Sequence, residues 1–228
     1  MIAPSEKTAA PRREGDLPPR ERILSAARAL FYRRGIHVVG VDAIAEAAGT
    51  NKMTLYRHFA SKDVLIAACL QELTREFDVV WETIAAANEG DARGQLRAWL
   101  RHVCDFKENE AERGCALANA AVELPDKDHP ARLVIREAKS AHHARLVCLC
   151  RDAGLIDPEG LADEVQLLWE GARVTAQSVG PEGLSARLAG MLEALVAAHT
   201  PRGARAARRP PVTRNAVRTT SPTDSFTD

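Results

Sequence analysis

The 228-residue chain is long enough for one or two folded domains, and its 46% share of hydrophobic residues is typical of a globular protein with a buried core. It has no apolar run of about 18 residues and no apolar segment of the secretory type near its first residue, which argues against a membrane-spanning helix and predicts a cytoplasmic protein. Its five cysteines are an odd number without CxxC spacing, so we expect no disulfide framework, no zinc site and no cofactor.

The formal net charge of zero averages over three unlike parts. Residues 1–62 carry 11 Lys and Arg against 6 Asp and Glu, residues 63–200 carry 14 against 23, and residues 201–228 carry 6 against 2. A basic first part on an acidic body predicts that the first part binds a polyanion and that the body does not.

The beginning of the chain predicts an arm followed by three short helices. Residues 1–17 are rich in Pro, Ala and charges without a period, and we expect them to be disordered. Apolar residues at helical spacing predict a first amphipathic helix that starts at Pro19 and ends at Gly35. A second helix is expected over 41–48 and a third over 52–58.

The rest of the chain is also helical in pattern. We expect six further helices, which begin near Ser61, Asp91, Cys115, Asp128, Pro158 and Pro181. The longest runs from Ser61 to about Ala87. No alternating strand pattern and no internal repeat is found, so the predicted fold class is all-α. After Thr200 the chain turns to Pro, Arg, Ser and Thr, and we expect a disordered basic tail that either attracts phosphate weakly or only keeps the protein soluble.

The second and third predicted helices are joined by a tight turn after Gly49. On the third helix, Leu55 and Phe59 lie together on the side that packs into a core, whereas Met53 and Arg57 point away from it. A helix, a glycine turn and a second helix with a donor-rich exposed face form the helix-turn-helix pattern, whose second helix enters the DNA major groove. The alternative interpretation is a solvated face of a small helical domain.

The segment RERILSAARALFYRRGIHVVGVDAIAEAAGTNKMTLYRHFASKDVL resembles the DNA-binding domain of the TetR family of transcriptional regulators over its whole length. A weaker similarity links GCALANAAVELPDKDHPARLVIREAK to the C-terminal domain of a subgroup of that family. The resemblance implies an N-terminal three-helix helix-turn-helix domain, joined by a long fourth helix to a helical domain that dimerises and encloses a ligand pocket. It implies four parts, namely an arm (1–17), a DNA-binding domain (18–65), a ligand-binding and dimerisation domain (66–200) and a tail (201–228).

The resemblance also implies which residues contact DNA. Residues 52–58 of each subunit of a homodimer would enter one major groove of a palindromic operator, with Lys52 and Met53 near base edges and Tyr56, His58 and Lys62 near phosphates. The predicted DNA-binding residues are Gly40, Val41, Thr50, Asn51, Lys52, Met53, Thr54, Tyr56, Arg57, His58 and Lys62. Many members have Ser or Thr where Gly40 stands, so a hydroxyl contact to phosphate is absent here.

Two helices of the body carry aromatic and polar residues at helical spacing, and a third could add an amide. If these faces meet, they form an apolar cavity with a few polar groups, which is the usual form of a small-molecule site. The candidate ligand-binding residues are Trp99, His102, Val103, Phe106, Asn119, Trp169, Arg173 and Gln177. The alternative is ordinary core with solvated edges. The class of the ligand is not indicated.

Two further expectations concern other chemistry and assembly. His142, Cys148 and Cys150 do not converge on one helix, so we expect surface histidines and scattered thiols rather than a metal site. The helices that start at Pro158 and Pro181 are expected to form the dimer interface, because their apolar stripes are wide; Leu188 and Leu192 are expected on the shared face.

The sequence therefore predicts a DNA-binding transcriptional regulator, and specifically a repressor that a small-molecule effector releases from its operator. The alternative is a DNA-binding regulator without a small-molecule ligand, controlled by its abundance or by a protein partner. An enzyme is not expected, because the chain has no Ser/His/Asp order, no Gly-rich phosphate loop and no HExxH motif.

Overall fold

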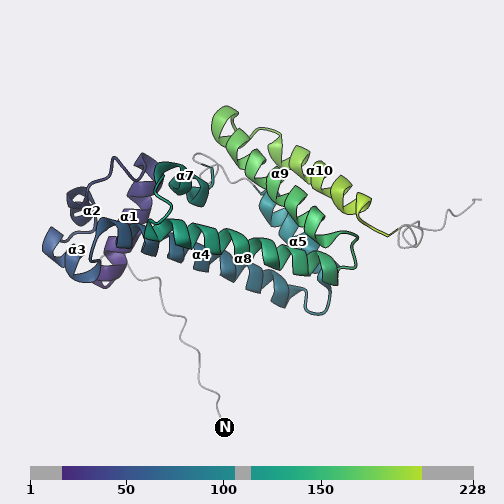
Figure 1. Ribbon diagram of the computed structural model, residues 1–228, viewed down its shortest axis with the longest axis horizontal. Coiled ribbons are helices and arrows are strands. Elements are labelled where there is room, and N and C mark those ends of the chain that lie inside the picture. The colour runs from purple at the N-terminus through teal and green to yellow at the C-terminus, as the bar shows by residue number, and fades with distance from the viewer. Residues whose placement is uncertain (1–16, 106–113, 202–228) are drawn as a thin grey trace, which may run out of the picture.

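The computed structural model describes residues 17–105 and 114–201, and within these ranges the chain forms α-helices and no strand (Figure 1). The all-α prediction is confirmed. The helices are α1 (Pro19–Arg34), α2 (Val41–Ala47), α3 (Lys52–His58), α4 (Lys62–Ala87), α5 (Ala92–Cys104), α7 (Ala116–Glu123), α8 (Pro130–Asp152), α9 (Pro158–Val179) and α10 (Leu184–Ala198). Over the described ranges, every helix is too short or too polar to cross a membrane. Residues 1–16 of the predicted arm, residues 202–228 of the predicted tail, and Phe106 lie outside the described residues.

Helices α1, α2 and α3 pack around one apolar core at one end of the molecule (Figure 1). Ile23, Ile44 and Leu55 have no exposed surface, because each comes from the inward face of its helix. Side-chain caps fix where the next helices begin: the Asn51 Oδ1 accepts the Thr54 N–H at 2.9 Å, and the Ser61 hydroxyl accepts the Val64 N–H at 3.1 Å. These caps satisfy backbone donors that the first turn of a helix leaves free, so α3 and α4 start where the sequence predicts.

The remaining helices form an elongated body. Helices α4 and α8 lie side by side along its length, α9 and α10 lie next to each other on one side, and α7 lies close to α1 (Figure 1). A second apolar core joins α4, α5, α8, α9 and α10. The first half of α4 belongs to the core of the N-terminal helices and its second half to the body, so this one helix is part of both.

Two helix starts differ from the prediction. The last helix begins at Leu184 rather than at Pro181, because Gly183 adopts a left-handed φ of +73° that no helix continues and that glycine adopts without steric cost. Helix α8 is capped by His129, whose Nδ1 accepts the Ala131 N–H at 3.1 Å, and not by Asp128.

The expectation that Leu188 and Leu192 lie on a shared face between subunits is wrong. Leu188 is 3% exposed and Leu192 1% exposed within the single chain, where both pack into the core of the body. The apolar stripe of α10 is therefore covered by α5 and α9 of the same chain. Large apolar side chains that α9 and α10 do expose include Leu167, Val174 and Met191.

Candidate DNA-binding surface and ligand cavity

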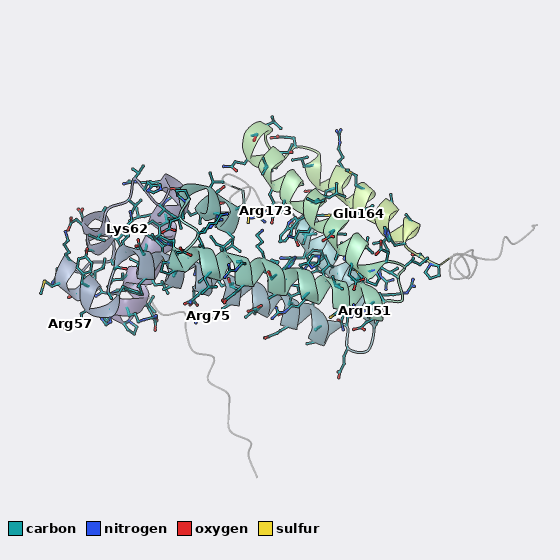
Figure 2. The ribbon with its side chains drawn as sticks, in the orientation of Figure 1. Arg57, Lys62, Arg75, Arg151, Glu164 and Arg173 are labelled. Carbon is teal, nitrogen blue, oxygen red and sulfur yellow. The ribbon has the colours of Figure 1, made fainter. Side chains whose placement is uncertain are left out.

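Helix α3 presents a polar, exposed face at the end of the molecule. Lys52, Tyr56 and Arg57 are exposed, and Met53 is 79% exposed, whereas Leu55 is buried against α1 and α2. Figure 2 shows Arg57 at the tip of the molecule, on the side of α3 away from the body. The exposed predicted residues of α3 thus lie on the part of the helix surface that does not pack against α1 and α2. We call this surface, formed by residues 50–58, the α3 face.

The other predicted DNA-binding residues in and near α3 differ in exposure. His58 is exposed, whereas Thr50, Thr54 and Val41 are half-buried. Asn51 is exposed but already caps α3 with its side-chain oxygen. Its side-chain oxygen therefore keeps the first turn of α3 in place, while its amide nitrogen remains available as a donor.

Lys52 and Lys62 have different surroundings although both are predicted to contact DNA. The Lys52 ammonium forms an exposed ion pair with Asp42 on α2, with 3.2 Å between Nζ and Oδ2. The Lys62 ammonium donates to the backbone carbonyl of Ile36 at 2.6 Å and lies 5.9 Å from the centre of the Phe31 ring. Lys62 therefore ties the start of α4 to the loop before α2, a role that the sequence does not indicate.

Gly40 is the N-cap of α2, and the structure leaves room for the hydroxyl that it lacks. Its backbone is extended, with φ −83° and ψ 157°, and a Cβ placed there would meet no atom within 4 Å. No side chain caps α2. A serine at this position can therefore adopt the existing backbone and cap the helix.

We expect Gly40→Ser to raise affinity for duplex DNA by about fivefold, or about 1 kcal/mol, because its hydroxyl adds one hydrogen bond to a phosphate. The gain should be alike for operator and unrelated DNA, since phosphate contacts carry no sequence information. Fluorescence anisotropy on both duplexes measures it. Gly40→Ala is the matched control, because it adds the Cβ without the hydroxyl; an equal gain from Ala would contradict the hydroxyl contact.

A cavity of about 1020 Å³ is bordered by α1, α4, α5, α7, α8 and α9. Five predicted ligand-binding residues line it: His102, Val103, Asn119, Trp169 and Arg173. Trp99 is fully buried behind the lining, and Gln177 is exposed beside Gly114 rather than in the described lining. Residues of α5, α7 and α9, which the sequence analysis could only suppose to face one another, thus line the same cavity.

Stacked aromatic rings form one wall of the cavity, and His142 lies in the middle of them. The His142 ring centre is 5.1 Å from that of Phe77, 5.5 Å from Trp81, and 5.2 Å from both Trp99 and Trp169. Trp81 and Trp99 stack at 5.2 Å, and Phe77 and Trp169 at 5.8 Å. We call these five residues the aromatic cluster. Sequence reasoning missed Phe77 and Trp81 as part of the site, because both read as core positions of a long helix.

His142 corrects the expectation of a surface histidine, since it is only 7% exposed. Its Nδ1 accepts the indole N–H of Trp81 at 3.3 Å, so the proton of the neutral ring is on Nε2. Burial lowers the pKa of His142 to about 4, and the charges of Lys139 and Arg145 act in the same direction. The imidazole is therefore neutral near pH 7 and offers one N–H donor.

Charged side chains around the cavity are mostly paired. Arg28 binds Glu76, Arg145 binds Asp78, and Lys139 binds Glu170. Arg173 differs: it donates to the carbonyl of Gly114 at 2.8 Å, and its guanidinium carbon lies 5.6 Å from the centre of the Trp169 ring. In Figure 2, Arg173 lies where α9 faces α7.

Helix α7 connects the cavity to the N-terminal helices. The Glu123 carboxylate, which borders the cavity, accepts the backbone N–H of Ile36 at 2.6 Å and that of His37 at 3.2 Å. The His37 ring also bonds to the Glu123 carbonyl. Lys62 donates a hydrogen bond to the carbonyl of Ile36. The loop before α2 is therefore hydrogen-bonded both to α7 and to α4.

Two buried thiols and the arrangement of possible metal ligands bear on other chemistry. Burial raises the pKa of Cys69, which borders the cavity, to about 12 and that of Cys150 to about 11, so both stay protonated. Across residues 17–105 and 114–201, no group of three His, Cys, Asp or Glu side chains is arranged to hold a metal ion.

Comparison with known proteins gives matches of two kinds. The profile of the family described as bacterial regulatory proteins, tetR family, matches residues 23–69. Among curated proteins, the HTH-type transcriptional activator FasR of Mycolicibacterium smegmatis is 39% identical over 106 residues, which are 44% of this chain and 47% of FasR. The HTH-type transcriptional regulator UidR of Escherichia coli is 43% identical over 53 residues, or 23% of this chain and 27% of UidR. The chain thus spans less than half of the length of these curated relatives.

Solved structures extend the similarity over most of the fold. SCO4454, a TetR-family transcriptional regulator from Streptomyces coelicolor, superimposes with a TM-score of 0.74 at 29% identity, covering 80% of this chain and 96% of that one. A second TetR-type regulator, sav143 from Streptomyces avermitilis, has a TM-score of 0.68 at 33% identity and covers 80% of this chain and 98% of its own. All four proteins are named as transcriptional regulators.

Proposed function

The chain belongs to the TetR family of transcriptional regulators, and we propose that it is a ligand-released repressor. In this proposal a homodimer places the α3 face of each subunit in one major groove of a palindromic operator, inside the cytoplasm. A small molecule that occupies the cavity lowers the affinity for that operator. FasR is named an activator. A reporter gene placed behind the operator therefore tests whether this protein represses or activates transcription.

The observation that carries the ligand-responsive form is the cavity of about 1020 Å³. A regulator controlled by abundance or by a protein partner needs no internal space and would have a filled core, because packing to full density is more stable. A space of this size, bordered by aromatic rings and a few polar groups, is within the usual range of small-molecule sites or slightly above it. The cavity therefore favours an effector over the alternative.

The exposed apolar residues on α9 and α10 support the homodimer. Leu167 is 74% exposed, and Val174 and Met191 are also exposed, on two helices that lie next to each other. Exposed apolar side chains gathered on one side of a protein are typical of an interaction surface. Small residues on the same helices, Gly171 and Gly190, meet no atom within 4 Å of an added Cβ and allow close approach of a second copy.

The loop before α2 is the proposed route from cavity to DNA. Glu123 on α7 and Lys62 on α4 bind opposite groups of the same residue, Ile36, and α2 begins a few residues later. A ligand that moves α7 or α4 therefore changes how α2 and α3 are held. The effect on operator affinity equals the difference in ligand affinity between the two arrangements, typically about 1–3 kcal/mol.

The test is a pair of titrations. The operator is found by selection from random duplexes, and an effector by its effect on the melting temperature. We expect the effector to bind the operator complex about 5–150-fold more weakly than the free protein, because coupling between two sites is reciprocal. Equal effector affinity with and without operator would rule out ligand release and favour the ligand-free alternative.

We expect Glu123→Gln to reduce that coupling by about 0.5–2 kcal/mol, because an amide binds the Ile36 and His37 N–H groups more weakly than a carboxylate does. Effector affinity of the free protein should change little. The same two titrations on the variant measure the difference. Glu89→Gln is the matched control, since Glu89 is exposed in the turn that follows α4. Equal loss of coupling in both variants would show that the contact with Ile36 has no part in it.

A further inference from the structure

Three buried N–H groups lie around a single ring, that of Trp169, and have no acceptor among the described residues. They are Trp99 Nε1, His142 Nε2 and Arg173 Nε. The ring centres of Trp99 and His142 are 5.8 Å and 5.2 Å from that of Trp169, and the guanidinium carbon of Arg173 is 5.6 Å away. Buried donors in folded proteins are nearly always bonded, so three together need an explanation.

An acceptor that comes with a ligand would explain why donors in this region are unbonded. An N–H group removed from water without a partner costs its full desolvation, and that cost is recovered when an acceptor arrives. Trp99 and His142 are more than nine-tenths buried, and neither can turn its N–H to solvent without breaking the packing of the aromatic cluster. The donors are therefore matched to an oxygen that comes with a ligand.

The charge near these donors indicates what kind of oxygen it is. The other Lys and Arg side chains that line the cavity, Arg28, Arg75, Lys139 and Arg145, each have a carboxylate partner. Arg173 has none among the described residues; its only described hydrogen bond is to a backbone carbonyl. A cation half-buried against aromatic rings, with one N–H unbonded, is best satisfied by a carboxylate, since charge-assisted bonds are shorter and stronger than neutral ones.

The aromatic rings could instead suggest a cationic ligand, because cations bind the faces of such rings. Here Lys139 and Arg173 already lie near the Trp169 ring, at 5.9 Å and 5.6 Å. A third cation would meet two like charges. Among the acids that line the cavity, Glu76, Asp78 and Glu123 already have partners in the chain, and Asp105 and Glu137 are exposed to solvent.

We propose that the effector is an aromatic carboxylate. Its flat apolar body lies in the cavity against Phe77 and Trp169, and its carboxylate accepts N–H bonds from Arg173 and from His142 or Trp99. The rings cover these donors in the ligand-free structure, so one ring must turn aside, and Phe77 is the half-buried member of the aromatic cluster. This inference rests on the proposed function, because it takes the cavity to be the effector site.

The experiment uses probes that share one ring system and differ only in head group: 1-naphthoate, 1-naphthamide and 1-naphthylmethylammonium. Calorimetric titration into the full chain at pH 7.5 gives each affinity. We expect the acid to bind about tenfold or more tightly than the amide, because its bond to Arg173 is charge-assisted, and the ammonium to bind most weakly. The intrinsic fluorescence should change on binding, since all three tryptophans of the chain are in the aromatic cluster.

Substitutions distinguish the contribution of the N–H donors to probe affinity from the contribution of the rest of the cavity. Arg173→Gln should bring the affinity for the acid down to that for the amide, while the amide itself is little affected. His142→Phe keeps an aromatic ring and should weaken acid and amide by similar factors. Arg136→Gln removes the same charge from an exposed position of α8 outside the cavity lining and should leave all affinities unchanged. Circular dichroism checks that each variant is folded.

Several results would overturn the inference: no probe binds, the amide or the ammonium binds as tightly as the acid, or Arg173→Gln keeps the preference for the acid. Failure of the proposed function looks different. If the acid binds as expected but does not release the operator, the carboxylate site stands and its role as effector site fails. If neutral compounds release the operator and acids do not, ligand release stands and the carboxylate inference is wrong.

Discussion

Leu192→Glu is expected to unfold the body, whereas Leu167→Glu is expected to leave it folded and separate the dimer. Leu192 is 1% exposed in a core shared by α5, α9 and α10, so a carboxylate there has no partner and costs more than about 4 kcal/mol. Leu167 is exposed in the single chain, so a charge disturbs only what packs on it. Thermal melting by circular dichroism and sedimentation velocity distinguish the two outcomes.

Separated subunits should lose operator binding even with an intact α3 face. Each half-site is then bound alone, and the gain of about 10²–10⁴ from linking two binding events is lost. Leu167→Ala is the matched control, since it shortens the side chain without adding charge and should keep both dimer and operator binding. A folded dimer in both Leu167→Glu and Val174→Glu would place the interface elsewhere.

Lys52→Ala should weaken operator binding by about 1–3 kcal/mol and relax the sequence preference, because a base contact is lost. The ion pair adds to this effect: without Lys52, the carboxylate of Asp42 faces the phosphates unpaired. Tyr56→Phe should instead weaken binding to operator and scrambled DNA alike. Because this substitution removes no cation, the salt dependence of binding should stay the same. Anisotropy titrations on both duplexes at several salt concentrations measure these quantities.

Asp42→Asn provides the control for the Lys52 substitution. It removes the partner and keeps the lysine, so it should raise affinity for every duplex by a similar factor and leave the sequence preference unchanged. If Lys52→Ala weakens operator and scrambled DNA equally, Lys52 is a phosphate contact. If neither Lys52→Ala nor Tyr56→Phe changes operator affinity, α3 is not the recognition helix.

Local signals in the sequence account for the first four helices. Asn51 and Ser61 are N-caps, and the spacing of Leu55 and Phe59 fixes which side of α3 is buried. These features act over a few residues and need no knowledge of the rest of the fold. The exposed side of α3 therefore follows from the sequence, and with it the surface proposed to bind DNA.

Features that depend on distant parts of the chain could not be predicted in this way. The periodicity of α10 shows that Leu188 and Leu192 lie on one apolar stripe, but not whether a second copy or the same chain covers it. His142 is buried because α4, α5 and α9 place rings around it, although its neighbour in sequence is polar. The bond between Glu123 and Ile36 joins residues 87 positions apart and leaves no local signal.

Because α4 is long, a small tilt of this helix would produce a large displacement of the N-terminal helices. Its 26 residues span about 39 Å, from Lys62 beside the N-terminal helices to the distal end of the body (Figure 1). Treated as a rigid rod pivoting at its distal end, the helix moves its other end by about 3.4 Å for a tilt of about 5°. In a dimer two such rods tilt in opposite senses, and the resulting change of about 7 Å is a fifth of the roughly 34 Å between successive major grooves. A rotation smaller than most loop movements would thus be enough to put the two α3 faces out of register with the DNA.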